Sequence, residues 1–527
     1  MRFFNTAGPV DCQRHYCLPP LTRFDLDEVL LFIQQMKYFV LHAPRQTGKT
    51  SCLLALMDYL NNQGDYRCAY VNVEVAQAAR EDVAAAMQAM LAELASWART
   101  ILNDEFVDSL WSEVLAKNGP YAALGEMLAR WAAHDPKPLV LLIDEIDSLV
   151  GDTLISVLRQ LRAGYARRPH HFPQSVILCG VRDVRDYRIH SASEKAVITG
   201  GSAFNIKAES LRLGDFSRKE VEALYQQHTA ETGQIITSEA LARVWKLTEG
   251  QPWLVNALGY EICFHLKAGR DRSQPLTADQ VEEAKENLIL RRETHLDQLA
   301  DKLQEERVRR VIGPLLAGDT VAEDFRQDDV SYLLDLGLIK QETGGAVRIA
   351  NPIYQEVIPR ELGWNIQSGM TEQTAWYVTP EGRLDMDKLL AAFQTFFREH
   401  SEHWVERFQY KEAGPQLLMQ AFLQRIVNGG GRIEREYGLG KLRTDLLIIW
   451  PYGNQVQKAV IELKILHKSL EQTLAQGLRQ TCAYMDRCGT SEGHLVIFDR
   501  TPGKSWEEKL FRRQEQANGK TITVWGM

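Results

Sequence analysis

The residues from Ala43 to Ser51 have the types and spacing of a loop that binds the phosphates of a nucleotide. An apolar run from Tyr38 to Leu41 precedes this segment and a second apolar run follows it, which predicts a strand, a loop and a helix. In such a loop, backbone N–H groups and the helix N-terminus hold the phosphates, Lys49 reaches the β and γ oxygens, and the Thr50 hydroxyl holds Mg²⁺. The sequence therefore predicts binding of ATP or GTP with Mg²⁺. The predicted contact residues are Ala43, which stands where the motif usually has glycine, and then Pro44, Arg45, Gln46, Thr47, Gly48, Lys49, Thr50 and Ser51.

Another apolar run, about a hundred residues further on, extends from Pro138 to Ile143 and ends in the carboxylates of Asp144 and Glu145. A buried strand with this ending is typical of the Walker B element of nucleotide hydrolases. Asp144 would hold the Mg²⁺ water shell, and Glu145 would orient and deprotonate the attacking water. Hydrolysis of the nucleotide is therefore predicted, and a solvent-facing pair of acids at a strand end is the alternative. Asp147 is assigned to helix capping.

Length and composition indicate a soluble protein of several domains. The 527 residues are too many for one hydrophobic core. We expect a cytoplasmic protein without a membrane partner, because no apolar run approaches the ~20 residues that span a bilayer and the first residues lack the pattern of a signal peptide. The eight cysteines are scattered without zinc-site spacing, which predicts reduced, mostly buried thiols and no structural metal. Residues 401–527 carry 18 Lys and Arg against 14 Asp and Glu, a mild excess of +4 that makes this part the better polyanion binder, with an ordinary solvated surface as the alternative.

Strands and helices alternate after the phosphate loop. Strands are expected near Cys68–Val75, Ser175–Cys179 and Phe204–Ala208, with a helix over Glu81–Leu102. This order predicts an α/β fold with a parallel sheet and at least one strand between the two nucleotide-binding strands. Arg182 follows a strand at the position of a γ-phosphate sensor, and an ordinary surface arginine is the alternative.

From Asp215 onward the pattern becomes helical, with Asp215 or Ser217 as the expected N-cap. Gly250 and Pro252 flank a single residue in this stretch, and such a Gly-x-Pro ends one helix and starts another. Together with the opening segment Phe3 to Pro9 and the phosphate loop, these residues resemble the STAND-type branch of the AAA+ ATPases, and especially bacterial AAA-like domain proteins.

This resemblance implies a helical lid and three further nucleotide contacts. Arg23, which precedes the first core helix, would touch the nucleotide. Gly250 and Pro252 would lie against the adenine and sense its identity, with simple helix punctuation as the alternative. Residues 307–362 alternate short predicted helices with a hairpin whose turn is at Gly344–Gly345, a pattern that resembles a winged helix. The resemblance to this ATPase class implies that such a module restrains the lid. The acidic residues 323–329 argue against a DNA-reading helix there.

The C-terminal part contains a second group of residues suited to chemistry. Asp445 begins an apolar strand, and a turn at residues 451–456 leads into a strand that carries Glu462 and Lys464. Antiparallel pairing across this turn places Asp445 opposite Glu462, with Lys464 on the same face. Two carboxylates and a lysine suit hydrolysis of a phosphodiester, in which the acids hold Mg²⁺ and the lysine steadies the nucleophile or the developing charge.

This arrangement resembles the core of the PD-(D/E)XK nucleases. A helix over Gln416–Asn428, a strand over Arg432–Tyr437 and a helix over Gln472–Tyr484 follow that family's order. Many members supply another acid from the first helix, where this chain has Gln416 and Gln420, with Glu412 upstream. Glu434 and Glu436 are the candidates to replace it. Gln480 and Tyr484 resemble polar additions common in the family.

The sequence as a whole predicts an ATP-driven switch that gates a Mg²⁺-dependent nuclease acting on DNA, and the STAND resemblance implies a role in stress or phage defence. Two alternatives stay open: an ATP-regulated nucleic-acid-binding or scaffolding protein with an inactive nuclease fold, and a motor stimulated by DNA that feeds the nuclease. The oligomeric state also stays open, with a homo-oligomer among the alternatives. The expected domains are an ATPase core (1–214), a helical lid (215–300), a winged-helix-like domain (301–365), a linker (366–400) and a nuclease-like domain (401–527).

Overall fold

In the computed structural model, the chain folds into two compact units. The first comprises Met1–Arg291 with Asp335–Gly337, and the second comprises Arg292–Leu334 with Leu338–Met527. The residues that the structure describes are 1–183, 188–191, 196–199, 204–291, 295–296, 301–303, 305–317, 326–342, 345–358, 377–408, 419, 422–423, 431–436, 445–453, 455–466, 469–499, 501 and 504–527.

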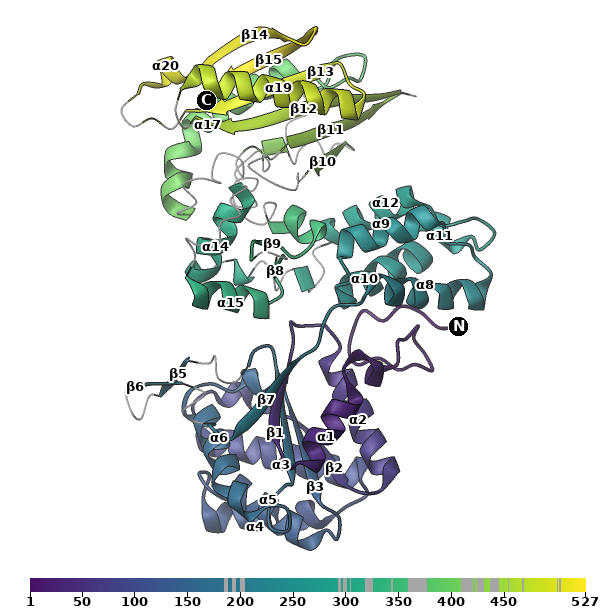
Figure 1. Ribbon diagram of the computed structural model, residues 1–527, viewed down its shortest axis with the longest axis vertical. Coiled ribbons are helices and arrows are strands. Elements are labelled where there is room, and N and C mark those ends of the chain that lie inside the picture. The colour runs from purple at the N-terminus through teal and green to yellow at the C-terminus, as the bar shows by residue number, and fades with distance from the viewer. Residues whose placement is uncertain are drawn as a thin grey trace. The chain divides into compact units, whose positions relative to one another are not determined.

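A parallel sheet forms the centre of the first unit (Figure 1). Its five strands, in the described part of the chain, have the order β2-β3-β4-β1-β7, so β4 separates the two strands that carry the nucleotide motifs. The predicted α/β fold and the intervening strand are therefore confirmed. Parallel strands place their carboxyl ends at one edge, where the loops after β1 and β3 meet. The strands are β1 (Tyr38–His42), β2 (Arg67–Asn72), β3 (Leu139–Asp144), β4 (Ser175–Gly180) and β7 (Lys207–Arg212), and a hairpin of β5 (Arg188–Ser191) and β6 (Ala196–Thr199) lies between β4 and β7 in sequence.

Helices cover both faces of this sheet because its strands are apolar on both faces. Phe39 and Leu41 of β1 pack in one core with residues of α1 and α2, whereas Tyr38 and Val40 pack in the other with residues of α3 to α6. The phosphate loop therefore lies between a buried strand and a buried helix. The covering helices are α1 (Leu26–Gln34) and α2 (Lys49–Gln63) on one side, and α3 (Val83–Ile101), α4 (Phe106–Asn118), α5 (Ala123–His134) and α6 (Gly151–Gly164) on the other.

A helical lid follows β7 in the same unit. Its first helix begins with a capping box in which Ser217 and Glu220 each bond the other's backbone N–H, so the second of the two expected N-caps is the one used. Gln251 caps the helix that Pro252 starts. The lid helices are α8 (Arg218–Thr232), α9 (Ser238–Thr248), α10 (Pro252–Tyr260), η6 (Glu261–His265), α11 (Lys267–Arg270) and α12 (Ala278–Leu290).

The N-terminal segment packs on the lid and differs from expectation in its cysteines. Phe4 is buried against Tyr16 and Tyr225, with ring centroids 4.9 and 4.8 Å away. Cys12 and Cys17 form a disulfide, so the prediction of reduced thiols is wrong for this pair. The physical reason is the fold of this segment, which brings their Cα atoms to 5.2 Å, within disulfide range.

The second unit begins with short helices and a hairpin. The helices α14 (Glu306–Ala317) and α15 (Gln327–Asp335) precede the antiparallel strands β8 (Ile339–Gln341) and β9 (Val347–Ile349). The acidic start of α15 is partly neutralised within this unit, because Asp329 forms ion pairs with Arg310 at 2.9 Å and Arg307 at 3.5 Å.

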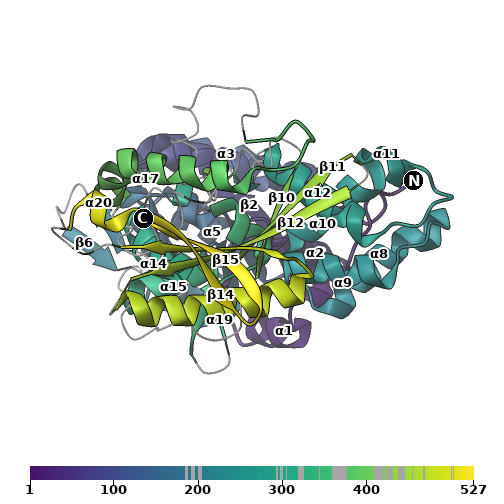
Figure 2. The same ribbon diagram turned by 90° about the horizontal axis from the view of Figure 1, so that it is seen from above.

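A mixed sheet with the order β10-β11-β12-β13-β15-β14 forms the C-terminal part of the described chain. The helices α17 and α19 lie on opposite sides of it (Figure 2). Helix α17 (Met386–Phe408) runs through the expected boundary at residue 400, and its Leu389 and Phe393 share a core with the sheet. The other elements are β10 (Arg432–Glu436), β11 (Asp445–Tyr452), β12 (Gln455–Ile465), α19 (Leu470–Cys488), β13 (Glu492–Phe498), α20 (Trp506–Lys509), β14 (Phe511–Ala517) and β15 (Lys520–Gly526).

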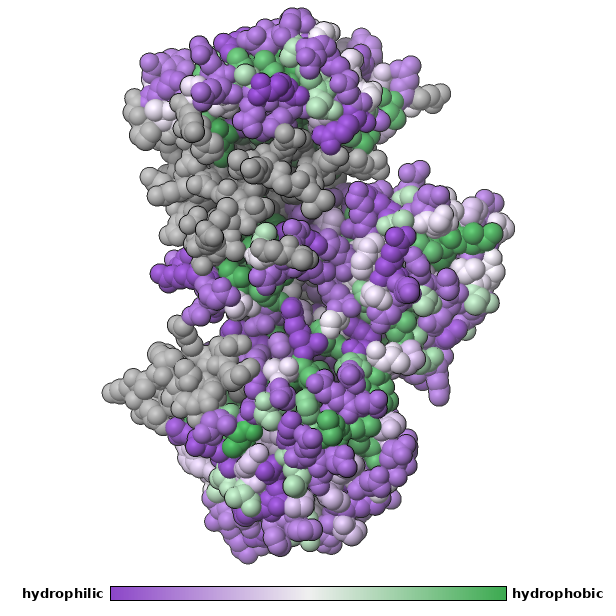
Figure 3. Space-filling model, viewed as in Figure 1, coloured by the Kyte–Doolittle hydropathy of each residue, from purple (hydrophilic) through white to green (hydrophobic). Residues whose placement is uncertain are grey.

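The surface is mainly hydrophilic in the view of Figure 3, with hydrophobic residues in smaller groups. Exposed large hydrophobic side chains include Tyr121, Val150 and Val456. None of the helices in the described ranges combines the length and apolar character needed to cross a membrane.

Gly250 provides a test of the lid's construction. Its φ is +81°, and a Cβ there would lie 1.9 Å from the Phe216 carbonyl oxygen. Gly250→Ala should therefore destabilise the protein by roughly 3 kcal/mol or more, as measured by urea unfolding without nucleotide. Gly233 is the matched control, since its φ is +75° but a Cβ would meet nothing within 4 Å. Gly233→Ala should cost only the ~1–2 kcal/mol of a left-handed alanine, and equal losses in the two variants would contradict the packing argument.

Candidate functional site

The phosphate loop joins β1 to α2 as predicted. Gly48 has φ +92° directly before Lys49, the first residue of α2, and Gln46 has φ +57°. The Lys49 ammonium donates hydrogen bonds to the carbonyl oxygens of Ala43 and Pro44, each at 3.0 Å. These bonds hold the lysine at the loop from which it would reach phosphate oxygens.

The carboxylate of Asp144 meets the end of this loop. Asp144 is fully buried at the end of β3. Its Oδ2 accepts hydrogen bonds from the Thr50 hydroxyl at 2.7 Å and the Tyr70 hydroxyl at 2.9 Å, and its Oδ1 accepts one from the backbone N–H of Glu145 at 3.0 Å. The structure thus brings together two residues assigned to Mg²⁺ from sequence, Thr50 and Asp144.

Thr50 and Asp144 fit a Mg²⁺ ion bound with nucleotide phosphates. A hydroxyl and a carboxylate are oxygen ligands of the kind that Mg²⁺ prefers, and this ion usually takes its other ligands from phosphates and water. Their 2.7 Å contact places both oxygens at one point beside the phosphate loop. No group of three or more His, Cys, Asp and Glu side chains in the described part of the chain is arranged to hold a metal by itself.

Glu145, the residue predicted to be the general base, directly follows Asp144 at the end of β3. Its backbone φ is +55°, an uncommon conformation for a residue other than glycine that often marks functional sites. Burial raises the pKa of its carboxyl group and the nearby Lys49 partly offsets this effect. A raised pKa makes the carboxylate a better proton acceptor, which suits deprotonation of water.

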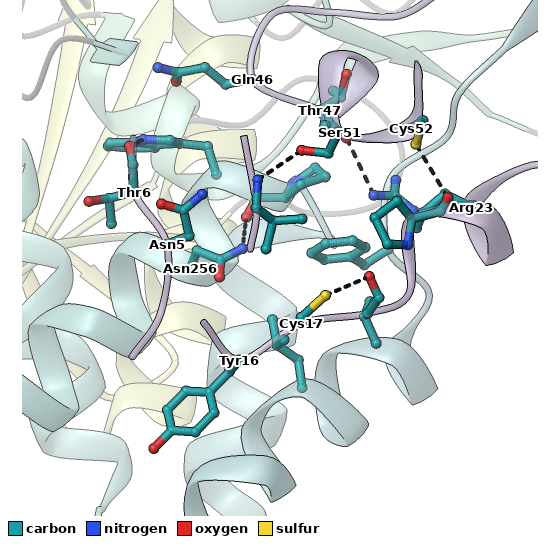
Figure 4. A pocket seen from close by; sticks show the side chains of 18 of the residues that line it. Asn5, Thr6, Tyr16, Cys17, Arg23, Gln46, Thr47, Ser51, Cys52 and Asn256 are labelled. Atoms are coloured by element: carbon teal, nitrogen blue, oxygen red, sulfur yellow. Dashed lines mark hydrogen bonds between the residues drawn. The ribbon is translucent and has the colours of Figure 1, made fainter. Parts of the chain in front are cut away.

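A pocket of about 140 Å³ opens beside the phosphate loop within the first unit (Figure 4). The N-terminal segment, the loop and the lid each supply walls. Val10 donates its backbone N–H to the Ser51 hydroxyl at 2.9 Å, and Trp253 donates its indole N–H to the Thr6 carbonyl at 3.0 Å. The polar side chains that line the pocket include Asn5, Thr6, Arg23, Gln46, Thr47, Ser51 and Asn256.

Arg23 lines this pocket and links the loop to the start of the lid. Its guanidinium donates to the carbonyl oxygens of Thr47 at 3.3 Å and Gly214 at 2.5 Å, and it lies 4.4 Å from the Phe216 ring centroid. Burial lowers the pKa of Arg23. Arg23 thus lies in the wall of this pocket, with one backbone partner on the phosphate loop and the other just before the lid.

The two residues of the Gly-x-Pro have separate places. Pro252 lines the pocket. Gly250 is absent from the described lining and instead lies against the lid's first residues, where its carbonyl accepts the Phe216 N–H at 2.8 Å. Pro252 is therefore placed to contact a ligand, and Gly250 is placed to hold the backbone that carries Pro252.

Arg182 lies just beyond β4 and forms an ion pair with Asp335 at 3.2 Å. Asp335 belongs to the short stretch that clusters with the first unit. The arginine is thus at the expected edge of the sheet, and its partner in this conformation is a carboxylate.

The second group of residues lies on the C-terminal sheet. Asp445 pairs with Glu462 in the antiparallel register of β11 and β12, which confirms the predicted hairpin register. Glu462 is fully buried, and its Oε1 lies 2.5 Å from the Lys464 ammonium. Gln480 of α19 is also buried, and its Oε1 has no hydrogen-bond partner among the described residues.

Apolar side chains support this hairpin from behind. Leu446 and Ile461 pack in the core on the α17 side, so alternation leaves Glu462 and Lys464 on the α19 side. In β10, Glu436 pairs with Asp445 and Glu434 pairs with Leu447. Gln416, Gln420 and Glu412 lie outside the described residues.

Sequence reasoning missed several residues of the nucleotide site. Tyr70 and Asn256 belong to no motif, and Asn5 lies in the opening segment without having been assigned to the nucleotide; all three reach the site through the fold. The one local signal was the tyrosine itself: Tyr70 lies between Ala69 and Val71 in a predicted strand, and the hydroxyl of a buried tyrosine usually finds a hydrogen-bond partner.

A family model described as "AAA-like domain" matches residues 32–358. No curated protein matches the chain. Among solved structures, the chain is similar to a Walker-type ATPase of Pyrococcus abyssi, with 14% identity, a TM-score of 0.42, and coverage of 67% of this chain and 99% of that one.

Two proteins of Thermotoga maritima are also similar. One is the RuvB Holliday junction branch migration motor, with 14% identity, a TM-score of 0.32, and coverage of 62% of this chain and 92% of that one. The other is domain III of the replication initiation protein DnaA, with 12% identity, a TM-score of 0.32, and coverage of 52% and 93%. The family model, which covers more than half of the chain and contains both nucleotide motifs, shows that this protein belongs to the AAA-like domain family of P-loop ATPases.

Proposed function

We propose that this protein binds ATP with Mg²⁺ at the phosphate loop and hydrolyses it, and that the nucleotide state gates a metal-dependent nuclease in the C-terminal part. The observation that carries the ATPase is the 2.7 Å contact between Thr50 and Asp144, which joins both nucleotide motifs at one point. The pocket beside the loop, with its mixed polar and apolar walls, supports a nucleotide base as the neighbouring group.

In hydrolysis, each residue at the sheet edge has a distinct task. The loop N–H groups and Lys49 bind and orient the phosphates. Thr50 and Asp144 would hold Mg²⁺, which neutralises charge developing on the transferred phosphoryl group. Glu145 accepts a proton from the attacking water. Arg182 would sense the γ-phosphate after exchanging Asp335 for phosphate oxygens, because both partners are anionic and compete for the same guanidinium.

The nuclease proposal is supported by the register of Asp445 with Glu462 and by the buried Glu462–Lys464 pair. A carboxylate in a fully buried position is costly unless a cation compensates it. Lys464 supplies one cation, and a divalent metal held by Asp445 and Glu462 would supply another and would lower the pKa of a bound water. In that site Lys464 would orient the nucleophile. The side-chain carbonyl oxygen of Gln480 is buried and accepts no hydrogen bond from the described residues, so it could accept one from a bound water.

DNA is the proposed substrate, and stress or phage defence in the cytoplasm is the proposed setting. The mild positive balance of residues 401–527 supports a polyanionic partner. ATP binding would select one conformation of the protein through its differential affinity for open and closed lids, and that conformation would permit cleavage. We propose a homo-oligomer as the form of the protein that switches.

The ATPase is tested with Glu145→Gln. This variant should bind ATP as the wild type does but release phosphate roughly 10²–10⁴-fold more slowly, because it lacks the proton acceptor. Asp147→Asn is the matched control, since Asp147 is a neighbouring acid whose Oδ1 accepts the Val181 N–H at 3.0 Å, a bond that asparagine can keep. Phosphate release and binding of a fluorescent ATP analogue are measured on all three proteins. Normal turnover in Glu145→Gln would exclude the assigned base.

The nuclease is tested with Glu462→Gln on plasmid DNA in Mg²⁺ or Mn²⁺, with and without ATP. Cleavage should fall roughly 10²-fold or more, the scale on which loss of one charge-stabilising group lowers kcat. Glu515→Gln is the control, because Glu515 lies on β14 at the opposite edge of the same sheet. Circular dichroism checks folding. Absence of cleavage by the wild type under every condition would favour an inactive nuclease fold, and strong stimulation of ATP hydrolysis by DNA would favour a motor.

A further inference from the structure

We propose that Tyr70 is a positioning residue for the magnesium site, fixing the carboxylate of Asp144 from β2, which neighbours β3 on the side away from β1 in the sheet order. The inference rests on the proposed binding of ATP with Mg²⁺. Tyr70 lies in β2, outside both nucleotide motifs, and its hydroxyl donates to Asp144 Oδ2 at 2.9 Å. It touches the carboxylate rather than the phosphates, so its effect on the metal would act through Asp144.

Two hydroxyls, a backbone N–H and the thiol of Cys179 on β4 hydrogen-bond the Asp144 carboxylate, and the thiol is the weakest donor among them. Thr50 and Tyr70 both donate to Oδ2, and the Glu145 N–H donates to Oδ1. Without Tyr70, Oδ2 would lose one of its two hydroxyl donors, and the other, Thr50, must also offer a lone pair to the metal. Tyr70 is therefore the hydroxyl donor that stays with the carboxylate when the ion binds.

The Tyr70 ring is held rigidly enough to serve as such a support. Its backbone pairs with Leu142 of β3, two residues before Asp144. The ring is buried, and its centroid lies 4.6 Å from that of Trp97 on α3, at an interplanar angle of 57°.

Residues of this kind orient a metal-binding group without touching the metal, and their mutation commonly lowers the affinity for the metal. A carboxylate that can rotate must lose that freedom when the ion binds, and the loss weakens binding. The effect should be specific to the metal. Binding of ATP in the absence of a divalent ion should depend on the phosphate loop and the pocket, which Tyr70 does not line.

The test compares Tyr70→Phe with Tyr38→Phe in the full-length protein. Tyr38 is an equally buried tyrosine of the same sheet, but its hydroxyl donates to the Pro173 carbonyl at 2.8 Å. Mn²⁺ replaces Mg²⁺ as the probe, and the electron paramagnetic resonance signal of free Mn²⁺ is titrated in the presence of saturating ATP. Binding of a fluorescent ATP analogue is measured separately in EDTA. If Tyr70→Phe melts early, the same titrations are run in the cold with trimethylamine N-oxide to keep it folded.

Tyr70→Phe should raise the Mn²⁺ dissociation constant roughly tenfold and leave ATP affinity in EDTA unchanged, and Tyr38→Phe should change neither. Wild-type Mn²⁺ affinity in Tyr70→Phe would overturn the inference while leaving the proposed ATP site intact. An equal shift in Tyr38→Phe would also overturn it, because the effect would then belong to the sheet. A folded wild type that binds no ATP would overturn the proposed function and this inference together.

Discussion

The hydrogen bond between the Thr50 hydroxyl and the Asp144 carboxylate is the contact on which the nucleotide site depends. It joins residues 94 positions apart in sequence, and it can form only because β1 and β3 end at the same edge of a parallel sheet with β4 between them. Two apolar cores, one on each face, hold those strands in register. A buried carboxylate without donors would be costly, so the donors around Asp144 stabilise the fold and prepare the metal site together.

The same unit connects the phosphate loop to the lid through few but well-defined contacts. Arg23 bonds the Thr47 carbonyl on the loop and the Gly214 carbonyl before the lid. The N-terminal segment makes a second connection, since Val10 bonds Ser51 and Thr6 accepts the Trp253 indole. A nucleotide in the pocket would touch all three parts, and its binding energy would therefore favour one arrangement of lid and core over others.

The sequence predicted those features that depend on local pattern. The loop from Ala43 to Ser51, the acids after β3 and the pairing of Asp445 with Glu462 follow from motif spacing and from period-two alternation, and the structure agrees with each. The roles assigned to Arg182, Lys464 and the other site residues stay predictions. These roles are contacts with a nucleotide, a metal ion or a nucleic acid, and contacts within the protein do not test them.

Features created by the tertiary fold were not predictable in the same way. Tyr70 reaches Asp144 because β2 lies beside β3, an order that the sequence does not encode locally. The Cys12–Cys17 bond depends on a loop conformation with no regular period, and α17 extends through the predicted boundary at residue 400. Gly250 was assigned to the nucleotide because of its motif, whereas its tight approach to Phe216 is a backbone constraint that appears only in three dimensions.

The most direct test of this account is calorimetric titration of the purified protein with ATP and Mg²⁺, for the wild type and for Lys49→Ala. The account predicts one ATP per chain for the wild type and an affinity at least roughly 100-fold lower for the variant, a difference of about 2.7 kcal/mol, because the ammonium that meets the phosphates is lost. Equal affinity in the two folded proteins, or no binding to the wild type, would contradict the central claim that this loop holds a nucleotide.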